Sequence, residues 1–120
     1  MRKKVMIIDE DEIFSEELNQ ALILSGYDVV AVNDPVLAVD MVRKTEPDVI
    51  LLDIKMPTRN GLRIVNELKN YLGYETIPII GMTGLSREAD IELMNVCGIQ
   101  KYLKKPFHPL DIISNIEKVV

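Results

Sequence analysis

The sequence predicts an α/β fold, a doubly wound parallel sheet of five strands in a single domain. Five short apolar runs recur along the chain, at residues 5–8, 29–32, 49–52, 77–80 and 102–103. The first four are mostly β-branched or unbroken rather than alternating, which is typical of strands buried on both faces of a parallel sheet. The fifth run is short and mixed in character, so it predicts an edge strand. Segments with helical period separate the runs, and together these observations indicate five βα units.

The first two helices are indicated by apolar spacing and by residues typical of helix ends. Apolar side chains four, seven and eight positions apart mark one face of the first helix: Phe14, Leu18, Ala21 and Leu22. Gly26 stands where this helix would stop. Asp34 followed by Pro35 predicts an N-cap and a first helical position, for a second helix that reaches about Lys44.

The remaining three helices repeat the apolar period. The third is predicted from Leu62, Val65, Leu68 and Leu72 before Gly73, the fourth from Ile91, Met94 and Cys97 before Gly98, and the fifth from Leu110, Ile113, Ile116 and Val120. Right-handed crossovers between parallel strands then place helices on both faces of the sheet. Cys97 is predicted to be a small buried core residue.

Length and charge restrict the classes of function. The chain has 120 residues, which fits one domain spanning 1–120, and its formal net charge is −5. This is the wrong sign for wrapping nucleic acid or lying on an anionic membrane. The single cysteine rules out an internal disulfide, and no apolar run approaches the ~18–20 residues of a membrane span. We therefore expect a cytoplasmic protein.

Chemically active side chains follow four of the five predicted strands. In sheets of this kind, ligands bind at the carboxyl ends of the strands. Asp9 and Glu10 follow the first strand, and Asp53 follows the third. Thr83 follows the fourth strand, and the fifth leads to Lys105. The topology therefore predicts acids, a hydroxyl and an amine at one edge of the sheet.

Acids brought together from two strands repel each other and therefore attract a cation. At ~4 Å, two unit charges interact by roughly 1 kcal/mol in bulk water and about 4 kcal/mol at an effective dielectric near 20. Oxygen ligands without His or Cys suit Mg²⁺. Lys105 adds a second positive charge and Thr83 a hydroxyl that can bond an anionic oxygen. This set favours a phosphoryl group accepted by a carboxylate, as an aspartyl phosphate.

With this combination of residues, the sequence resembles a known family, the receiver domains of two-component response regulators. Four segments carry the resemblance in order: residues 7–10, residues 48–57 with Gly61, residues 82–83, and residues 102–107. The resemblance covers essentially the whole chain. It implies a flavodoxin-like fold with strand order 2-1-3-4-5, like that of the single-domain chemotaxis regulators. It also implies a cis peptide bond between Lys105 and Pro106.

The resemblance implies a role for each active side chain. Asp53 would accept a phosphoryl group from a phosphohistidine on a sensor histidine kinase or a histidine phosphotransfer protein. Thr83 and Lys105 would engage the phosphoryl oxygens, and Thr83 with Tyr102 would form a switch. Mg²⁺ would be held by Asp9, Glu10, Asp53 and the backbone carbonyl of Lys55. Such a domain catalyses only its own phosphorylation and dephosphorylation, so we expect a signalling domain rather than an enzyme.

Output through a downstream effector, or through a homodimer, is implied for the face formed by the fourth helix, fifth strand and fifth helix. Leu93 and Val96 lie outside the core stripe of the fourth helix, so either they face a partner or the core face is broad. Ile13 lies outside the stripe of the first helix, and either contacts the histidine partner or is a single exposed residue. Whether the chain stands alone or belongs to a longer regulator stays open.

Three residues depart from the family pattern or modify it. Glu10 stands where Asp is common, and its longer side chain could shift the metal geometry or act through a water. Gly84 stands where Ala is usual, which leaves more access to the phosphoryl group but a looser loop. Lys55, two residues after Asp53, is a candidate for controlling the lifetime of the phosphate through its side chain.

Several of these residues also have purely structural interpretations. Asp9, Glu10 and Asp53, taken singly, are acids of the kind found in turns and caps. Asp11 is predicted to be the N-cap of the first helix, and His108, which precedes a proline, a helix-start residue. Tyr102 could simply be a half-buried strand aromatic.

Two other functions compete with the receiver. Asp9 and Asp11 also fit the Asp-x-Asp pattern of a haloacid-dehalogenase-type phosphatase, with Asp9 as nucleophile and Asp11 as general acid and base. Against it, no paired acids follow Lys105, and the chain is short for such an enzyme. The third candidate is a receiver used only as an interaction module, without phosphorylation.

Overall fold

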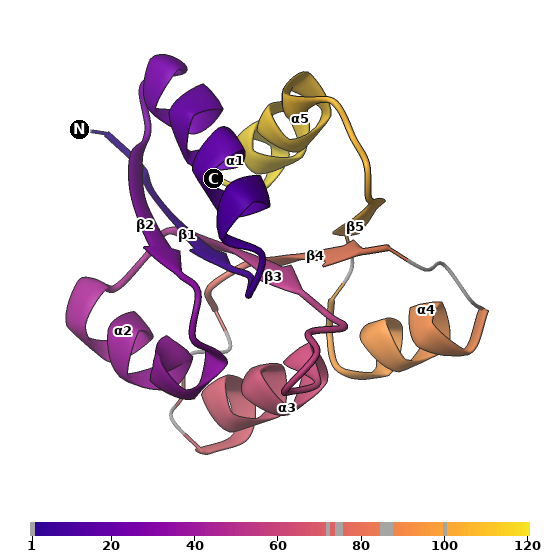
Figure 1. Cartoon of the computed structure of the whole chain (residues 1–120). Helices are drawn as coiled ribbons and strands as arrows, with labels where there is room; N and C mark the ends of the chain where they lie inside the picture. The colour runs from indigo at the N-terminus through magenta and orange to yellow at the C-terminus, as the bar shows by residue number, and fades with distance from the viewer. Residues whose placement is uncertain (1, 72, 74–75, 85–87, 100) are drawn as a thin grey trace.

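A computed structural model describes residues 2–71, 73, 76–84, 88–99 and 101–120. Five parallel strands form one sheet in the order β2-β1-β3-β4-β5, which confirms the expected fold class (Figure 1). The strands are β1 (Lys4–Ile8), β2 (Asp28–Val32), β3 (Val49–Asp53), β4 (Ile79–Thr83) and β5 (Lys101–Lys104). The order places β1, β3 and β4 in the middle of the sheet and reverses direction beside β1.

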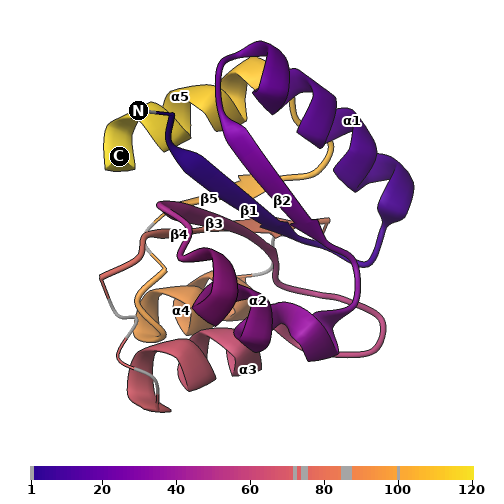
Figure 2. The ribbon, with the colours of Figure 1, turned by 90° about the vertical axis from the view of Figure 1, so that its left-hand side faces the viewer.

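Helices cover both faces of the sheet. The helical segments are α1 (Glu12–Leu24), a 3₁₀ turn (Pro35–Leu37), α2 (Ala38–Thr45), α3 (Gly61–Asn66), a π-helical segment (Glu67–Tyr71), α4 (Glu88–Val96) and α5 (Pro109–Val119). The two helices α1 and α5 lie on one face, and α2, α3 and α4 lie on the other (Figure 2). Two separate apolar cores result, one on each side of the sheet. Among the helices described, none combines the length and apolar character needed to cross a bilayer.

The sheet is buried at its centre and partly exposed at both edges. All residues of β3 and β4 are buried, as expected for strands covered on both faces. The edge strand β5 alternates between half-buried and exposed positions, also as expected. The prediction for β2 was wrong, because Val29 and Val30 are only half-buried and Ala31 is exposed. The strand order makes β2 the second edge, so its run of β-branched residues does not indicate full burial.

The predicted helix ends are formed by the expected residues. The Asp11 carboxylate accepts the Phe14 N–H at 3.0 Å and caps α1, while Gly26 follows its end with a positive φ of 95°. The Asp34 carboxylate accepts the Val36 N–H at 3.0 Å. The helix that follows Asp34 differs from the prediction in one respect. The turn that begins at Pro35 is a 3₁₀ turn, and the α-helix α2 starts only at Ala38. His108 caps α5 as predicted, with its Nδ1 accepting the Leu110 N–H at 3.1 Å.

Three packing predictions need correction. The third helix is not α-helical to its end, because it continues from Asn66 into the π-helical segment; Leu72, predicted on its stripe, lies outside the described residues. On α5 the fully buried residues are Ile112 and Ile116, whereas Leu110 is 67% exposed. Adjacent apolar residues left the register of that face ambiguous. Cys97 is half-buried against the core rather than fully buried.

Candidate functional site

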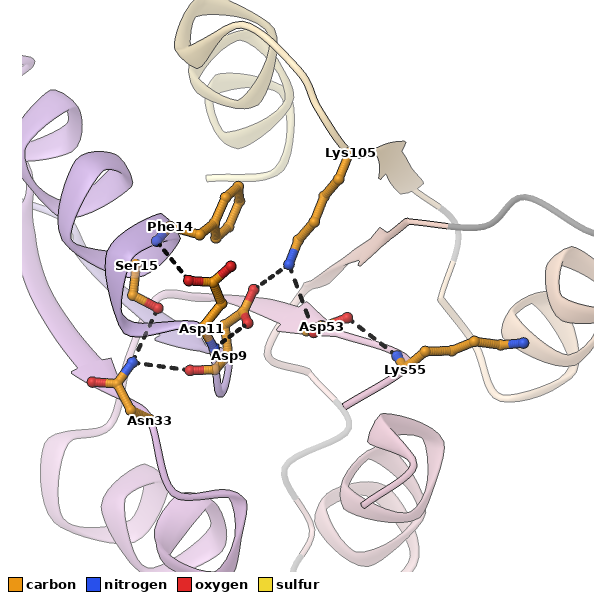
Figure 3. Close-up of polar contacts among 8 residues, drawn as sticks. All are labelled: Asp9, Asp11, Phe14, Ser15, Asn33, Asp53, Lys55 and Lys105. Carbon is orange, nitrogen blue, oxygen red and sulfur yellow. Dashed lines mark hydrogen bonds and ion pairs between the residues drawn. The ribbon is translucent and has the colours of Figure 1, made fainter. Parts of the chain in front are cut away.

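The carboxyl ends of four strands bring the predicted side chains to one edge of the sheet. Asp9 directly follows β1, Asp53 and Thr83 end β3 and β4, and Lys105 directly follows β5. Asp9 and Asp53 are 1% and 7% exposed, and Thr83 is fully buried. Figure 3 shows the Lys105 ammonium between the two carboxylates. The structure therefore gathers two acids, a hydroxyl and an amine, as parallel strand ends require.

The Lys105 side chain is fixed by charge and by aromatic contact. Its Nζ lies 2.5 Å from Asp9 Oδ2 and 3.6 Å from Asp53 Oδ2. The ammonium also lies over the Phe14 ring, 4.1 Å from its centroid, where the ring face attracts a cation. Phe14 in turn packs edge-on against Phe107, with ring centroids 5.7 Å apart. These contacts aim one positive charge at both acids.

The backbone at both ends of this contact is held in place. The Lys105 N–H donates to the Thr83 carbonyl at 2.7 Å, and the Lys105–Pro106 peptide bond is cis, as the resemblance implied. On the other side, Asp9 Oδ1 accepts the Asp11 N–H at 2.9 Å. The Asn33 amide donates to the Asp9 carbonyl at 2.9 Å and to the Ser15 hydroxyl at 3.1 Å (Figure 3). The position of Asp9 is therefore determined by α1 and by the end of β2 as well as by β1.

Burial and a neighbouring charge change the acidity of Asp53. Desolvation raises the pKa of its carboxyl, and the negative charge of Asp9 raises this pKa further. Lys105 and the hydrogen bond from the Lys55 N–H, at 3.1 Å from Asp53 Oδ1, act in the opposite direction. Beside this effect on the pKa, the site holds two carboxylates against one ammonium, which leaves one negative charge in excess. The site therefore favours a second positive charge.

Glu10 lies apart from this pair. Its Oε1 accepts a hydrogen bond from the Thr58 N–H at 3.1 Å, and it also accepts one from the Thr58 hydroxyl. Thr58 belongs to the loop between β3 and α3, so the bond joins the turns that follow β1 and β3. Within the described ranges, no three His, Cys, Asp or Glu residues converge as a metal-binding group. The structure thus brings together Asp9 and Asp53, and places the Glu10 carboxylate on Thr58.

Lys55 contacts two parts of the molecule. Its backbone N–H bonds Asp53, but its side chain extends away from that carboxylate toward α4 (Figure 3). There its Nζ lies 3.0 Å from Asp90 Oδ2, in a pair that is partly exposed. The amine proposed as a control on the phosphate lifetime is therefore engaged with α4.

Close approach of the chain to Asp53 explains the glycine at the start of α3. A Cβ on Gly61 would lie 2.5 Å from the Asp53 carbonyl oxygen and 3.0 Å from Ile54 Cα. The Gly61 N–H donates to the Ile54 carbonyl at 2.8 Å, and a β-bridge joins Lys55 to Asn60. The loop after β3 therefore folds back tightly on the strand that carries Asp53.

The remaining candidates lie around this centre. Tyr102 is 37% exposed on β5, and a Cβ added to Gly84 would meet no described residue within 4 Å. Leu93, Val96 and Ile13 are 50%, 84% and 76% exposed. The exposure of the first two agrees with a face open to a partner rather than with a broad core.

Sequence reasoning missed the residues that support the site from other elements. These are Phe14, Ser15, Asn33, Thr58 and Asp90. Phe14 was assigned to the core stripe of the first helix, although its ring also faces Lys105. Each of these residues lies far along the sequence from the residue that it contacts. Only Asn33 could have been found from its position, because it directly follows β2.

Comparison with known proteins defines the class to which this fold and site belong. Residues 5–117 match the family described as the response regulator receiver domain. Because this match covers nearly all of the chain, the chain belongs to that family. The family that the sequence resembled is therefore confirmed. A receiver domain has a signalling role in two-component systems.

Individual relatives agree with this assignment. The chain is 29% identical over 116 residues to the "DNA-binding response regulator MtrA" of Mycobacterium tuberculosis strain H37Rv, which covers 97% of this chain and 50% of that protein. The same identity and coverage are found for MtrA of Mycobacterium leprae. The chain thus spans about half the length of the curated relatives that it matches.

Solved structures share the fold over the whole chain. The chemotaxis protein CheY4 of Vibrio cholerae superposes with a TM-score of 0.93 and 24% identity, covering 100% of both chains. The signal receiver domain of a signal transduction histidine kinase from Syntrophus aciditrophicus gives a TM-score of 0.86 and 27% identity, covering 98% of this chain and 89% of that one. The fold of this chain therefore matches both structures over nearly its whole length.

Proposed function

We propose that Asp53 is the phosphoacceptor of this receiver domain, and that its donor is a phosphohistidine on a sensor histidine kinase or a histidine phosphotransfer protein. The observation that carries the proposal is the Lys105 ammonium between Asp53 and Asp9, at distances of 3.6 and 2.5 Å. Asp53 ends β3, the middle strand of the five, and the tightly folded loop lies beside it. Residues 1–120 would form this one domain.

The donor set at the site suits Mg²⁺. Two carboxylates carry two negative charges against the one positive charge of Lys105, and oxygen is the ligand that Mg²⁺ prefers. The pKa of Asp53 is raised first by burial and then by the neighbouring Asp9 charge, and a bound cation would offset the second effect. Asp9, Asp53 and the Lys55 carbonyl would hold the ion, with Glu10 as a further ligand. When bound, Mg²⁺ would neutralise charge on the phosphoryl oxygens.

The chain's own residues would then perform the transfer. An Asp53 carboxylate oxygen forms a bond to phosphorus while the phosphorus–nitrogen bond of the phosphohistidine breaks, and the nitrogen leaves with the bonding electron pair. Lys105 neutralises charge on the transferring group, which is how most of the barrier is lowered in phosphoryl transfer. The Thr83 hydroxyl donates a hydrogen bond to a phosphoryl oxygen. The domain would catalyse only this step and the later hydrolysis of its own phosphate.

The signal would pass from Thr83 and Tyr102 to the face formed by α4, β5 and α5. Supporting this proposal, Tyr102 and Thr83 lie on adjacent strands, and Leu93 and Val96 leave apolar surface exposed on α4. A cytoplasmic effector protein or domain, or a second copy of the chain, would bind there. The chain matches half the length of MtrA, which is described as a DNA-binding response regulator, so we also propose an attached effector domain as one form of output.

The competing phosphatase is disfavoured by Asp11. In that mechanism Asp11 must act as a general acid and base, but its carboxylate caps α1 by accepting the Phe14 N–H. Family membership also favours the receiver.

One experiment separates the three candidate functions. The protein is incubated with Mg²⁺ and a small acyl phosphate, and the added phosphoryl group is measured by intact mass spectrometry. Labelling that is lost in Asp53→Asn supports the receiver. Loss only in Asp9→Asn, with steady turnover of the donor, would support the phosphatase instead. Absence of labelling in the unaltered protein would leave an interaction module.

A further inference from the structure

The Glu10–Thr58 contact is separate from the buried centre of the site. Both donors of Thr58, the backbone N–H and the hydroxyl, converge on the same oxygen of Glu10. Hydrogen bonds to a carboxylate are stronger than neutral ones, so this pair of bonds holds Glu10 at the loop after β3. The longer side chain of a glutamate makes that reach possible. Thr58 itself is exposed and has no place in the apolar core.

Charge at the centre of the site opposes the approach of the Glu10 carboxylate to Asp9 and Asp53. The Asp9 and Asp53 carboxylates against the Lys105 ammonium leave one negative charge in excess (−2 + 1 = −1). Adding the Glu10 carboxylate would leave two (−3 + 1 = −2), in surroundings where Asp9 and Asp53 are almost completely buried. Repulsion therefore opposes the approach of a third acid until positive charge is added.

We infer that Thr58 is a positioning residue that holds Glu10 away from the metal site, so that Glu10 must leave Thr58 before it can ligate Mg²⁺. This inference rests on the proposed function, in which Glu10 is one of the ligands. The hydrogen bonds to Thr58 stabilise the arrangement in which Glu10 lies away from Asp9 and Asp53, and they therefore weaken the affinity for the cation. The same exchange releases the turn after β1 from the loop after β3.

The test is a calorimetric Mg²⁺ titration of the intact chain and its Thr58→Val variant. Valine keeps the backbone N–H and the shape of the side chain but removes the hydroxyl donor. Mg²⁺ should therefore bind about three- to tenfold more tightly, as expected for the net loss of one exposed hydrogen bond. Thr58→Ser, which restores the hydroxyl, should return the affinity to that of the unaltered protein. In that protein, Mg²⁺ should also shift the Thr58 amide resonance.

Thr45→Val is the matched control. The Thr45 hydroxyl donates to the Met41 carbonyl at 2.7 Å on α2, so its loss should leave Mg²⁺ affinity unchanged. Unchanged or weaker binding in Thr58→Val would overturn the inference, the latter by showing that Thr58 holds Glu10 in the ligating position. If the unaltered protein binds Mg²⁺ and Asp53 is labelled, that failure concerns Thr58 alone. An unaltered protein that neither binds Mg²⁺ nor is labelled would overturn the proposed function as well.

Discussion

The two sides of the site are built in different ways. On the inner side, Asp9, Asp53 and Lys105 follow or end strands of the sheet, and the acids are almost completely buried. On the outer side, the loop after β3 is held by polar contacts at the surface, from Thr58 to Glu10 and from Lys55 to Asp90. The inner contacts follow from the positions of the strands. The outer contacts are exposed, and each therefore contributes less free energy. We therefore assign the chemistry to the inner side and its adjustment to the outer side.

Removing the inner ammonium should have the largest effect. In Lys105→Met, the two carboxylates face each other without compensation, and the transferring phosphoryl group loses its charge partner. We expect the initial rate of labelling by a small acyl phosphate to fall by about 100-fold, the scale of losing one preorganised electrostatic contact. Time-resolved intact mass spectrometry measures this rate.

Lys104→Met is the control for that variant, because Lys104 is an exposed neighbour on β5. It removes the same charge from the chain without touching the acids. Equal losses in the two variants would contradict the special role of Lys105.

Adding one methyl group at the junction of the two sides should destabilise the protein. In Gly61→Ala, the new Cβ would lie 2.5 Å from the Asp53 carbonyl oxygen, so the backbone must shift. We expect the free energy of unfolding to fall by about 1–3 kcal/mol, as for other overpacked positions. Denaturant unfolding measures this change. Gly84→Ala, where the added Cβ meets nothing within 4 Å, should be close to neutral, and an equal loss there would contradict the steric explanation.

The raised pKa of Asp53 predicts a dependence of stability on pH. The folded state holds the proton of this carboxyl more tightly than the unfolded state, where the pKa is 3.8. The ionised group therefore destabilises the fold above its raised pKa, and this penalty disappears as the pH falls toward 3.8. Asp53→Asn should be more stable than the unaltered protein at neutral pH, and the difference should shrink on acidification. Unfolding curves at several pH values without added metal test this; a difference that does not shrink would contradict it.

The outer ion pair should have the smallest effect on stability. Because the Lys55–Asp90 pair is partly exposed, we expect Asp90→Asn to lower the free energy of unfolding by less than about 1 kcal/mol, and the difference to disappear at high salt. The same variant frees the Lys55 amine from its contact with α4. If the Lys55 side chain controls the phosphate lifetime, the dephosphorylation rate changes in Lys55→Ala. An unchanged rate would show that the side chain has no part in it.

The same division explains how much the sequence alone could predict. Asp9, Asp53, Thr83 and Lys105 were found because parallel strands deliver their carboxyl ends to one edge, whatever the details of packing. Helix caps such as Asp11 and His108 were found because capping is local in sequence.

Contacts that depend on side-chain geometry between distant segments were not predictable. Thr58 is 48 residues from Glu10, and no period or local motif joins them. The partner of the Lys55 side chain depends on how α4 packs beside the loop. On α5, apolar residues at neighbouring positions allowed two faces, and only packing selected Ile112 over Leu110. Strand β2 has the β-branched residues typical of a buried strand but lies at the edge of the sheet. Its position follows from the strand order, which its own residues do not reveal.

The role of Asp53 as phosphoacceptor is tested most directly by locating the phosphoryl group on the chain. After labelling with Mg²⁺ and a small acyl phosphate, borohydride reduction converts an aspartyl phosphate to homoserine, and peptide mass spectrometry identifies the altered position. We expect homoserine at residue 53, and none there in Asp53→Asn. Homoserine at position 9 with position 53 unaltered would contradict it.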